Sequence, residues 1–198
     1  MEAFDFAFSL FAIILGLSLV EVLTGFSRAL KRRHVVRLGW LVPLLAIFVM
    51  LDLISFWEWA WGARTYVAPT YGILFIGLVV SGLYYLAASI IFPDEFGQHT
   101  DFDAHYLAHR RQVLGAVIVC NLIGTGWANA VLWGQLPVTT KIELALYYAL
   151  LIVGFITSRK RLGVAVLAAL IAIYLFTVQA TLVRDTLVST PAGPAQAR

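Results

Sequence analysis

Residues 38–61 read LGWLVPLLAIFVMLDLISFWEWAW and decide the fold class. The stretch is longer than the roughly 20 apolar residues that a helix needs to cross about 30 Å of hydrocarbon. Asp52 lies near its middle, and an ionised side chain there costs about 3 kcal/mol. We therefore predict a transmembrane helix over 38–61, and Asp52 is a candidate functional residue.

The rest of the chain repeats this pattern. Hydrophobic residues make up 61% of the sequence and charged residues 13%, against about 25% charged in a soluble domain, which excludes a water-soluble globule. We predict an all-α, polytopic integral membrane protein whose six transmembrane helices form antiparallel hairpins in one membrane domain, residues 1–183. The predicted spans are 4–27, 38–61, 67–92, 113–134, 142–157 and 162–183. Residues 184–198, rich in Pro, Gly and Ala, are predicted to be a disordered tail.

Most Lys and Arg residues lie in three loops of the predicted topology, at 28–37, 110–111 and 159–161. The positive-inside rule places these loops in the cytoplasm and both termini outside. We expect a multi-pass protein of a cell membrane, specifically the bacterial inner membrane. The same loops explain the net charge of +3, so we expect anionic lipid as a partner and no nucleic acid.

Polar residues in two other spans are expected near the depth of Asp52. Ser81 and Tyr85 lie in the third predicted span, and Asn121 lies in the fourth. One hypothesis makes these residues the partners of Asp52 in a proton- or ion-binding site. The alternative is that they form interhelical hydrogen bonds, each worth about 0.6 to 2 kcal/mol, that only hold the helices together.

Glu21 is the second acid inside an apolar span, and it lies closer to the predicted cytoplasmic side than Asp52 does. It is a candidate for the same acidic path. Its side chain can instead reach toward the cytoplasm or pair with Arg28, two helical turns further along the chain. Both interpretations stay open at this stage.

The loop at 93–112 reads PDEFGQHTDFDAHYLAHRRQ and is the only loop large enough for a site. Asp101, His105 and His109 are spaced i, i+4 and i+8, so a helix would place them on one face, where they could bind a transition metal. The alternative is a helix that is N-capped by Thr100, begins with acids and has no metal. No other cofactor is expected.

Several function classes lack their required residues. All 4 histidines lie in predicted cytoplasmic loops, so none can hold a haem between spans. No lysine lies in the middle of a span, and no P-loop or GxSxG motif is present, so retinal binding, ATP-driven pumping and standard hydrolase chemistry are not supported.

Three hypotheses remain. The first is transport or sensing of a proton or small cation through Asp52 and Glu21. The second is a non-catalytic membrane scaffold or accessory subunit, as a homo-oligomer or in a larger complex. The third is a metal-dependent enzyme at the cytoplasmic face; catalysis is otherwise not expected.

Overall fold

The computed structural model describes residues 3–34, 37–65, 68, 70–94 and 101–189, and every element in these ranges is a helix. The chain order is α1 (Ala3–Lys31), α2 (Leu41–Gly62), the 3-10 helix η1 (Ala63–Thr65), α3 (Tyr71–Ile91), α4 (Phe102–Asn121), the π-helix η2 (Leu122–Gly126), α5 (Trp127–Val131), α6 (Val138–Ile156) and α7 (Lys160–Ser189). The prediction of an all-α protein is confirmed for this part of the chain.

Five of these helices, α1, α2, α3, α6 and α7, are long and apolar enough to cross a membrane. The fourth predicted span, 113–134, takes another form. It is divided among α4, η2 and α5, which follow one another without a break from Phe102 to Val131. The first half of α4 reads FDAHYLAHRRQ and is polar, so the helix as a whole is less apolar than the other five.

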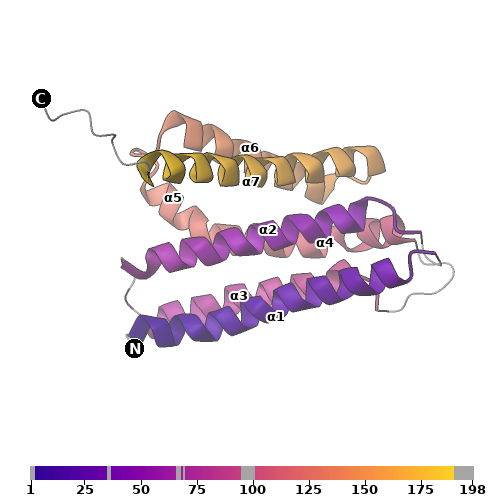
Figure 1. Ribbon diagram of the computed structural model, residues 1–198, viewed down its shortest axis with the longest axis horizontal. Helices are drawn as coiled ribbons and strands as arrows, with labels where there is room; N and C mark the ends of the chain where they lie inside the picture. The colour runs from indigo at the N-terminus through magenta and orange to yellow at the C-terminus, as the bar shows by residue number, and fades with distance from the viewer. Residues whose placement is uncertain (1–2, 35–36, 66–67, 69, 95–100, 190–198) are drawn as a thin grey trace, which may run out of the picture.

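The long helices lie in three layers of two (Figure 1). α1 packs on α3 in the first layer, α2 and α4 form the middle layer, and α6 packs on α7 in the third. The predicted contacts between sequential helices are present, but α1 packs most extensively on α3, which is not its neighbour in sequence. α1 begins and α7 ends at the same end of the bundle, here named the terminal end; the opposite end is named the loop end.

α2 begins at Leu41, three residues later than predicted, because the backbone before it turns sharply. Gly39 has a φ of 55°, in the left-handed region that favours glycine. A side chain at Gly39 would also collide with the carboxylate of Asp103. That carboxylate instead accepts a hydrogen bond from the backbone N–H of Leu41 at 3.3 Å. The chain between α1 and α2 is thereby fixed to the first turn of α4.

α3 ends close to the predicted end of its span, whereas α7 extends past the predicted end of its own. α3 ends at Ile91 because Phe92 precedes Pro93 and takes an extended conformation, with φ −106° and ψ 145°. α7 continues to Ser189, past the predicted end of the sixth span at residue 183. The remainder of the predicted tail, residues 190–198, lies outside the described residues.

The middle layer carries the centre of the core. α2 has both outer layers and α4 as neighbours, and most residues of 41–49 are buried. The buried residues there are Leu41, Val42, Leu45, Ala46, Phe48 and Val49. Since lipid tails are as apolar as these side chains, close packing and hydrogen bonds, more than exclusion of water, hold such helices together.

Candidate functional site

Asp52 lies near the middle of α2 and is completely buried, with 0% of its surface exposed. Its burial follows from the position of α2 in the middle layer, where α3, α4 and α7 cover it. The side chain therefore faces neither lipid nor open water. Such a carboxyl group requires hydrogen-bond partners from the protein itself.

Four side chains from four different helices donate hydrogen bonds to this carboxyl. The hydroxyl of Tyr84 on α3 donates to Oδ2 at 2.7 Å. The hydroxyls of Tyr147 on α6 and Tyr174 on α7 both donate to Oδ1 at 2.6 Å. The amide of Asn121 on α4 donates to Oδ1 at 3.0 Å and to Oδ2 at 3.2 Å. One carboxyl group thus connects all three layers of the bundle, and we name these five residues the Asp52 cluster.

The partners of Asp52 are neutral donors, a pattern that suits an ionised carboxylate. Among the described residues, no Lys, Arg or His forms an ion pair with it. A buried charge normally has a charged partner, because its desolvation costs several kcal/mol. At Asp52, the only partners that the described residues provide are neutral hydrogen-bond donors.

Further hydrogen bonds fix the donors in place. The Asn121 amide also donates to the carbonyl of Val117 at 3.0 Å, which orients its Nδ2 atom toward Asp52. The hydroxyls of Tyr147 and Tyr174 lie 3.2 Å apart. Ser55 donates to the backbone carbonyl of Asp52 at 2.7 Å, one turn back along α2. The cluster is therefore a connected network of hydrogen bonds, and its donors have little freedom to move relative to the Asp52 carboxyl group.

The π-helix η2 begins directly after Asn121. π-helical turns inside α-helices occur often at functional sites. Here the turn lies where Gly124 approaches the ring of Phe56; a Cβ atom at Gly124 would lie 2.7 Å from that ring. Thr125 in the same turn donates to the carbonyl of Asn121 at 3.1 Å. Glycine at this position allows α2 and η2 to pack closely beside the cluster.

A cavity of about 340 Å³ reaches the Asp52 cluster from the terminal end of the bundle. Tyr147, Tyr174 and Asn121 line it, with the buried Asp52 behind them. Glu58 and Glu143, both exposed, line it nearer the terminal end. Further polar groups in its lining belong to Ser55, Thr125, Asn129, Thr140, Tyr148 and Thr177, and the rest of the lining is mainly apolar. These polar side chains give water several partners next to three donors of Asp52.

Of the residues proposed as partners of Asp52, the structure brings only Asn121 to it. Ser81 is buried but donates within its own helix, to the carbonyl of Gly77 at 2.7 Å. Tyr85 is 40% exposed, and it lies on a different face of α3 from Tyr84, the residue before it, which belongs to the Asp52 cluster. Glu21 lies 3.9 Å from Arg28, as the pairing alternative proposed. None of these three residues contacts the Asp52 carboxyl.

Tyr84, Tyr147 and Tyr174 were not identified from the sequence. Their signal is their depth, because each lies well inside an apolar helix, whereas tyrosine in membrane proteins concentrates at the two interfaces. A hydroxyl at mid-membrane needs a hydrogen-bond partner, so three such tyrosines and one mid-span acid could have been matched by depth.

The predicted metal ligands lie at the start of α4, at the loop end. The rings of His105 and His109 stack with centroids 4.2 Å apart. Nε2 of His105 hydrogen-bonds the carbonyl of Ile90 at 3.0 Å, and Nδ1 of His109 hydrogen-bonds the carbonyl of His105 at 3.0 Å. In the described ranges, no three His, Cys, Asp or Glu side chains form a group that could hold a metal ion. The metal site stays a prediction without geometric support.

Asp101 is the N-cap of α4, which corrects the prediction that Thr100 has this role. Its carboxylate accepts from the backbone N–H groups of Asp103 at 2.9 Å and Ala104 at 3.2 Å. Lys160 lies 3.9 Å from Asp101 and 3.5 Å from Asp103, and joins the start of α7 to the start of α4. We name Asp101, Asp103 and Lys160 the loop-end charge cluster.

His105 is half-buried beside this cluster. Burial lowers the pKa of His105, and the positive charge of a protonated His109 lowers it further. The hydrogen bond to the carbonyl of Ile90 and the negative charge of Asp94 act in the opposite direction but do not cancel the effect of burial. The folded protein therefore favours the neutral form of this imidazole.

Comparison with known proteins adds no assignment, since no family model, curated protein or solved structure matches the chain. The class is defined by the molecule itself. Five long apolar helices indicate a multi-pass membrane protein, and its most unusual group is a buried carboxyl at the junction of three helix layers.

Proposed function

We propose that the protein takes up a proton at Asp52 from the terminal end, as a proton-transporting or proton-sensing membrane protein. The observation that carries the proposal is the cavity that ends on Tyr147, Tyr174 and Asn121, all donors to Asp52. Water in the cavity can exchange protons with the carboxyl through these hydroxyls, because a tyrosine hydroxyl both donates and accepts hydrogen bonds.

A proton fits this site better than a metal cation. Cations such as Na⁺ or Ca²⁺ need several oxygen ligands with lone pairs directed at the ion. Both oxygens of Asp52 instead accept hydrogen bonds from O–H and N–H groups at 2.6 to 3.2 Å. A metal ion would have to displace these donors, whereas a proton requires only that one hydroxyl changes from donor to acceptor.

The proposal includes a topology of six spans with both termini outside, in the bacterial inner membrane. It is supported by the positions of the chain ends, since α1 begins and α7 ends at the same end of the bundle in Figure 1. In this topology α4, η2 and α5 together form the fourth crossing along the chain, in addition to the five long apolar helices. The basic stretches at 28–34 and 159–161 lie at the loop end in Figure 1, and the positive-inside rule makes this end cytoplasmic. The cavity then opens toward the outside, near Glu58 and Glu143.

The first experiment measures proton uptake and proton flux. In proteoliposomes with an enclosed pH-sensitive dye, wild-type protein is expected to conduct protons and Asp52→Asn to conduct none. In infrared difference spectra between acid and neutral pH, wild type is expected to show a carboxylic acid band that Asp52→Asn lacks. The amide has nearly the same shape as the acid, so this substitution removes the titrating group with little change in packing.

Glu21→Gln is the matched control, because it also removes an acid from an apolar helix but lies outside the Asp52 cluster. It is expected to keep both the flux and the infrared band. A band without flux assigns sensing. A wild-type protein with neither signal, or an Asp52→Asn variant with both, contradicts the proposal.

The second candidate function is a non-catalytic scaffold or accessory subunit. It is favoured by the hydrogen bonds from α3, α4, α6 and α7 that converge on Asp52, since such a network can serve structure alone. In that case Asp52→Asn keeps every membrane phenotype, and the infrared band is absent from wild type.

A further inference from the structure

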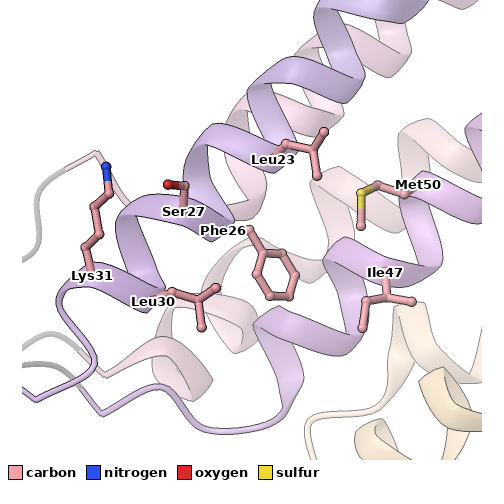
Figure 2. Close-up of a pocket in the computed structure, with 7 residues that line it drawn as sticks. All are labelled: Leu23, Phe26, Ser27, Leu30, Lys31, Ile47 and Met50. Carbon is pink, nitrogen blue, oxygen red and sulfur yellow. The ribbon is translucent and has the colours of Figure 1, made fainter.

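A second cavity, unrelated to the Asp52 cluster, lies between α1 and α2 near the loop end (Figure 2). Its volume is about 470 Å³. The apolar side chains that line it are Leu23, Phe26, Leu30, Ile47 and Met50. Leu23 and Leu30 are 50% and 53% exposed, so the cavity is a groove on the outer surface of the bundle, which we name the α1–α2 groove.

The α1–α2 groove has one polar end. Ser27 and Lys31, one turn apart on α1, belong to its lining, and Figure 2 shows their polar atoms directed away from Ile47 and Met50. Lys31 is exposed and begins the run Lys31-Arg32-Arg33, and the stretch 28–37 contains no acid. The apolar part of the groove therefore lies next to a strongly basic surface, which is expected at the level of the lipid headgroups.

We propose that the α1–α2 groove binds an anionic phospholipid, with an acyl chain along Leu23, Phe26 and Met50 and the phosphate at Lys31. The apolar walls match a hydrocarbon chain in shape and polarity, and Ser27 can donate a hydrogen bond to a phosphate or ester oxygen. Basic pockets between helices at the cytoplasmic face recognise anionic headgroups by charge. Zwitterionic lipids gain no net attraction from such a pocket.

The terminal end offers no equivalent basic pocket among the described residues. Arg64 there stacks over the ring of Trp61 at 4.4 Å, and Lys141 lies over Trp133 at 5.5 Å. Their charges are directed at aromatic rings, which is typical of interface anchors. We therefore expect selective binding of anionic lipid at the loop end and not at the terminal end.

The test is native mass spectrometry of the full-length protein in detergent, titrated with phosphatidylglycerol or phosphatidylcholine. Wild type is expected to bind phosphatidylglycerol more tightly than phosphatidylcholine. Lys31→Gln should weaken phosphatidylglycerol binding about five-fold, the effect of one basic residue near an anionic surface. Lys141→Gln, the matched loss of one charge at the terminal end, should change it less than about two-fold.

A second pair of variants tests the apolar part. Leu30→Trp fills the α1–α2 groove and is expected to reduce binding of both lipids, while Ile152→Trp, at a position 51% exposed on α6, is not. Equal binding of the two lipids by wild type, or equal effects of Lys31→Gln and Lys141→Gln, overturns the proposal. A dimer in the same spectra that Leu30→Trp abolishes, without lipid preference, assigns the groove to a second copy of the chain instead.

Discussion

The Asp52 cluster and the loop-end charge cluster hold the same chemical group in opposite ways. Asp52 is fully buried and depends on neutral donors, whereas the side chains of Asp101 and Asp103 are 41% and 22% exposed and share Lys160. The two loop-end acids also lie at the start of α4, where the helix dipole favours negative charge. At the loop end, water and several charges share the stabilisation; at Asp52, a few directional hydrogen bonds provide all of it.

The largest expected effect is that of Asp52→Ala. It leaves four donors without their acceptor, and at about 0.6 to 2 kcal/mol for each interhelical hydrogen bond we expect a loss of about 3 kcal/mol. Asp52→Asn keeps an acceptor for Tyr147 and Tyr174 and should lose about 1 kcal/mol. Denaturant unfolding of the purified protein in detergent measures both. Equal losses for the two variants would show that charge, not hydrogen bonding, stabilises the cluster.

Adjacent tyrosines on α3 provide the next test. Tyr84→Phe removes the 2.7 Å hydrogen bond to Asp52 and keeps the ring, so we expect a loss of about 1 kcal/mol. Tyr85→Phe makes the same chemical change one residue further along, at a side chain that is 40% exposed, and should have almost no effect. Thermal denaturation of both variants compares them directly; a larger loss for Tyr85→Phe would contradict the described cluster.

Much of the fold was predictable, and these two tyrosines show where prediction stopped. Hydropathy located the long apolar helices, since length and composition determine them. Tyr84 and Tyr85 differ by about 100° around the helix, and only the packing of α3 against the middle layer decides which of them faces Asp52. Asn121 does contact Asp52, and a mid-span amide and a mid-span acid have few other partners.

The start of α4 differs from the prediction for a related reason. The polar stretch 93–112 is predicted to be a cytoplasmic loop that contains a helix, but the helix that begins at Phe102 continues without a break into the fourth predicted span. Tyr106 and Arg110 are 2% and 7% exposed, so this polar turn packs into the bundle. Arg110 is held by the carbonyl of Leu107 and by the hydroxyl of Ser158 at 2.8 Å. Polarity alone did not reveal that the Arg110 guanidinium finds acceptors inside the protein.

A smaller effect is expected from pH at the loop end. Burial lowers the pKa of His105 below its unfolded value near 6.5, so the unfolded chain binds more protons as pH falls. Stability is therefore complete above about pH 6.5 and decreases below it. Thermal unfolding between about pH 7.5 and pH 5 measures this, and His105→Gln should flatten the dependence by more than His109→Gln does. Asp94, the nearby acid, stays unchanged in both variants. A stability that rises as the pH falls would contradict this sign.

The smallest effect is expected from Lys160→Ala. The lysine side chain is 51% exposed, and exposed ion pairs contribute about 0 to 1 kcal/mol. We expect a loss below about 0.5 kcal/mol that disappears at about 1 M salt, where charges are screened within about 3 Å. Urea unfolding at low and high salt checks this. A loss as large as that of Asp52→Ala would remove the distinction between the two clusters.

The π-helix η2 has a consequence for how this chain tolerates changes in length. A π-helical turn accommodates one residue more than the α-helical turn it replaces. Deleting one residue within Leu122–Gly126 would restore regular α-helix and leave the residues that follow in nearly the same rotational register, because the π-helical turn already absorbs the extra residue. Asn129 would then still line the cavity, and Asn121 would keep its place beside Asp52. A single-residue deletion in the regular helix α4 would instead rotate everything that follows by about 100°. The chain should therefore tolerate the loss of one residue in η2 better than the loss of one residue in α4.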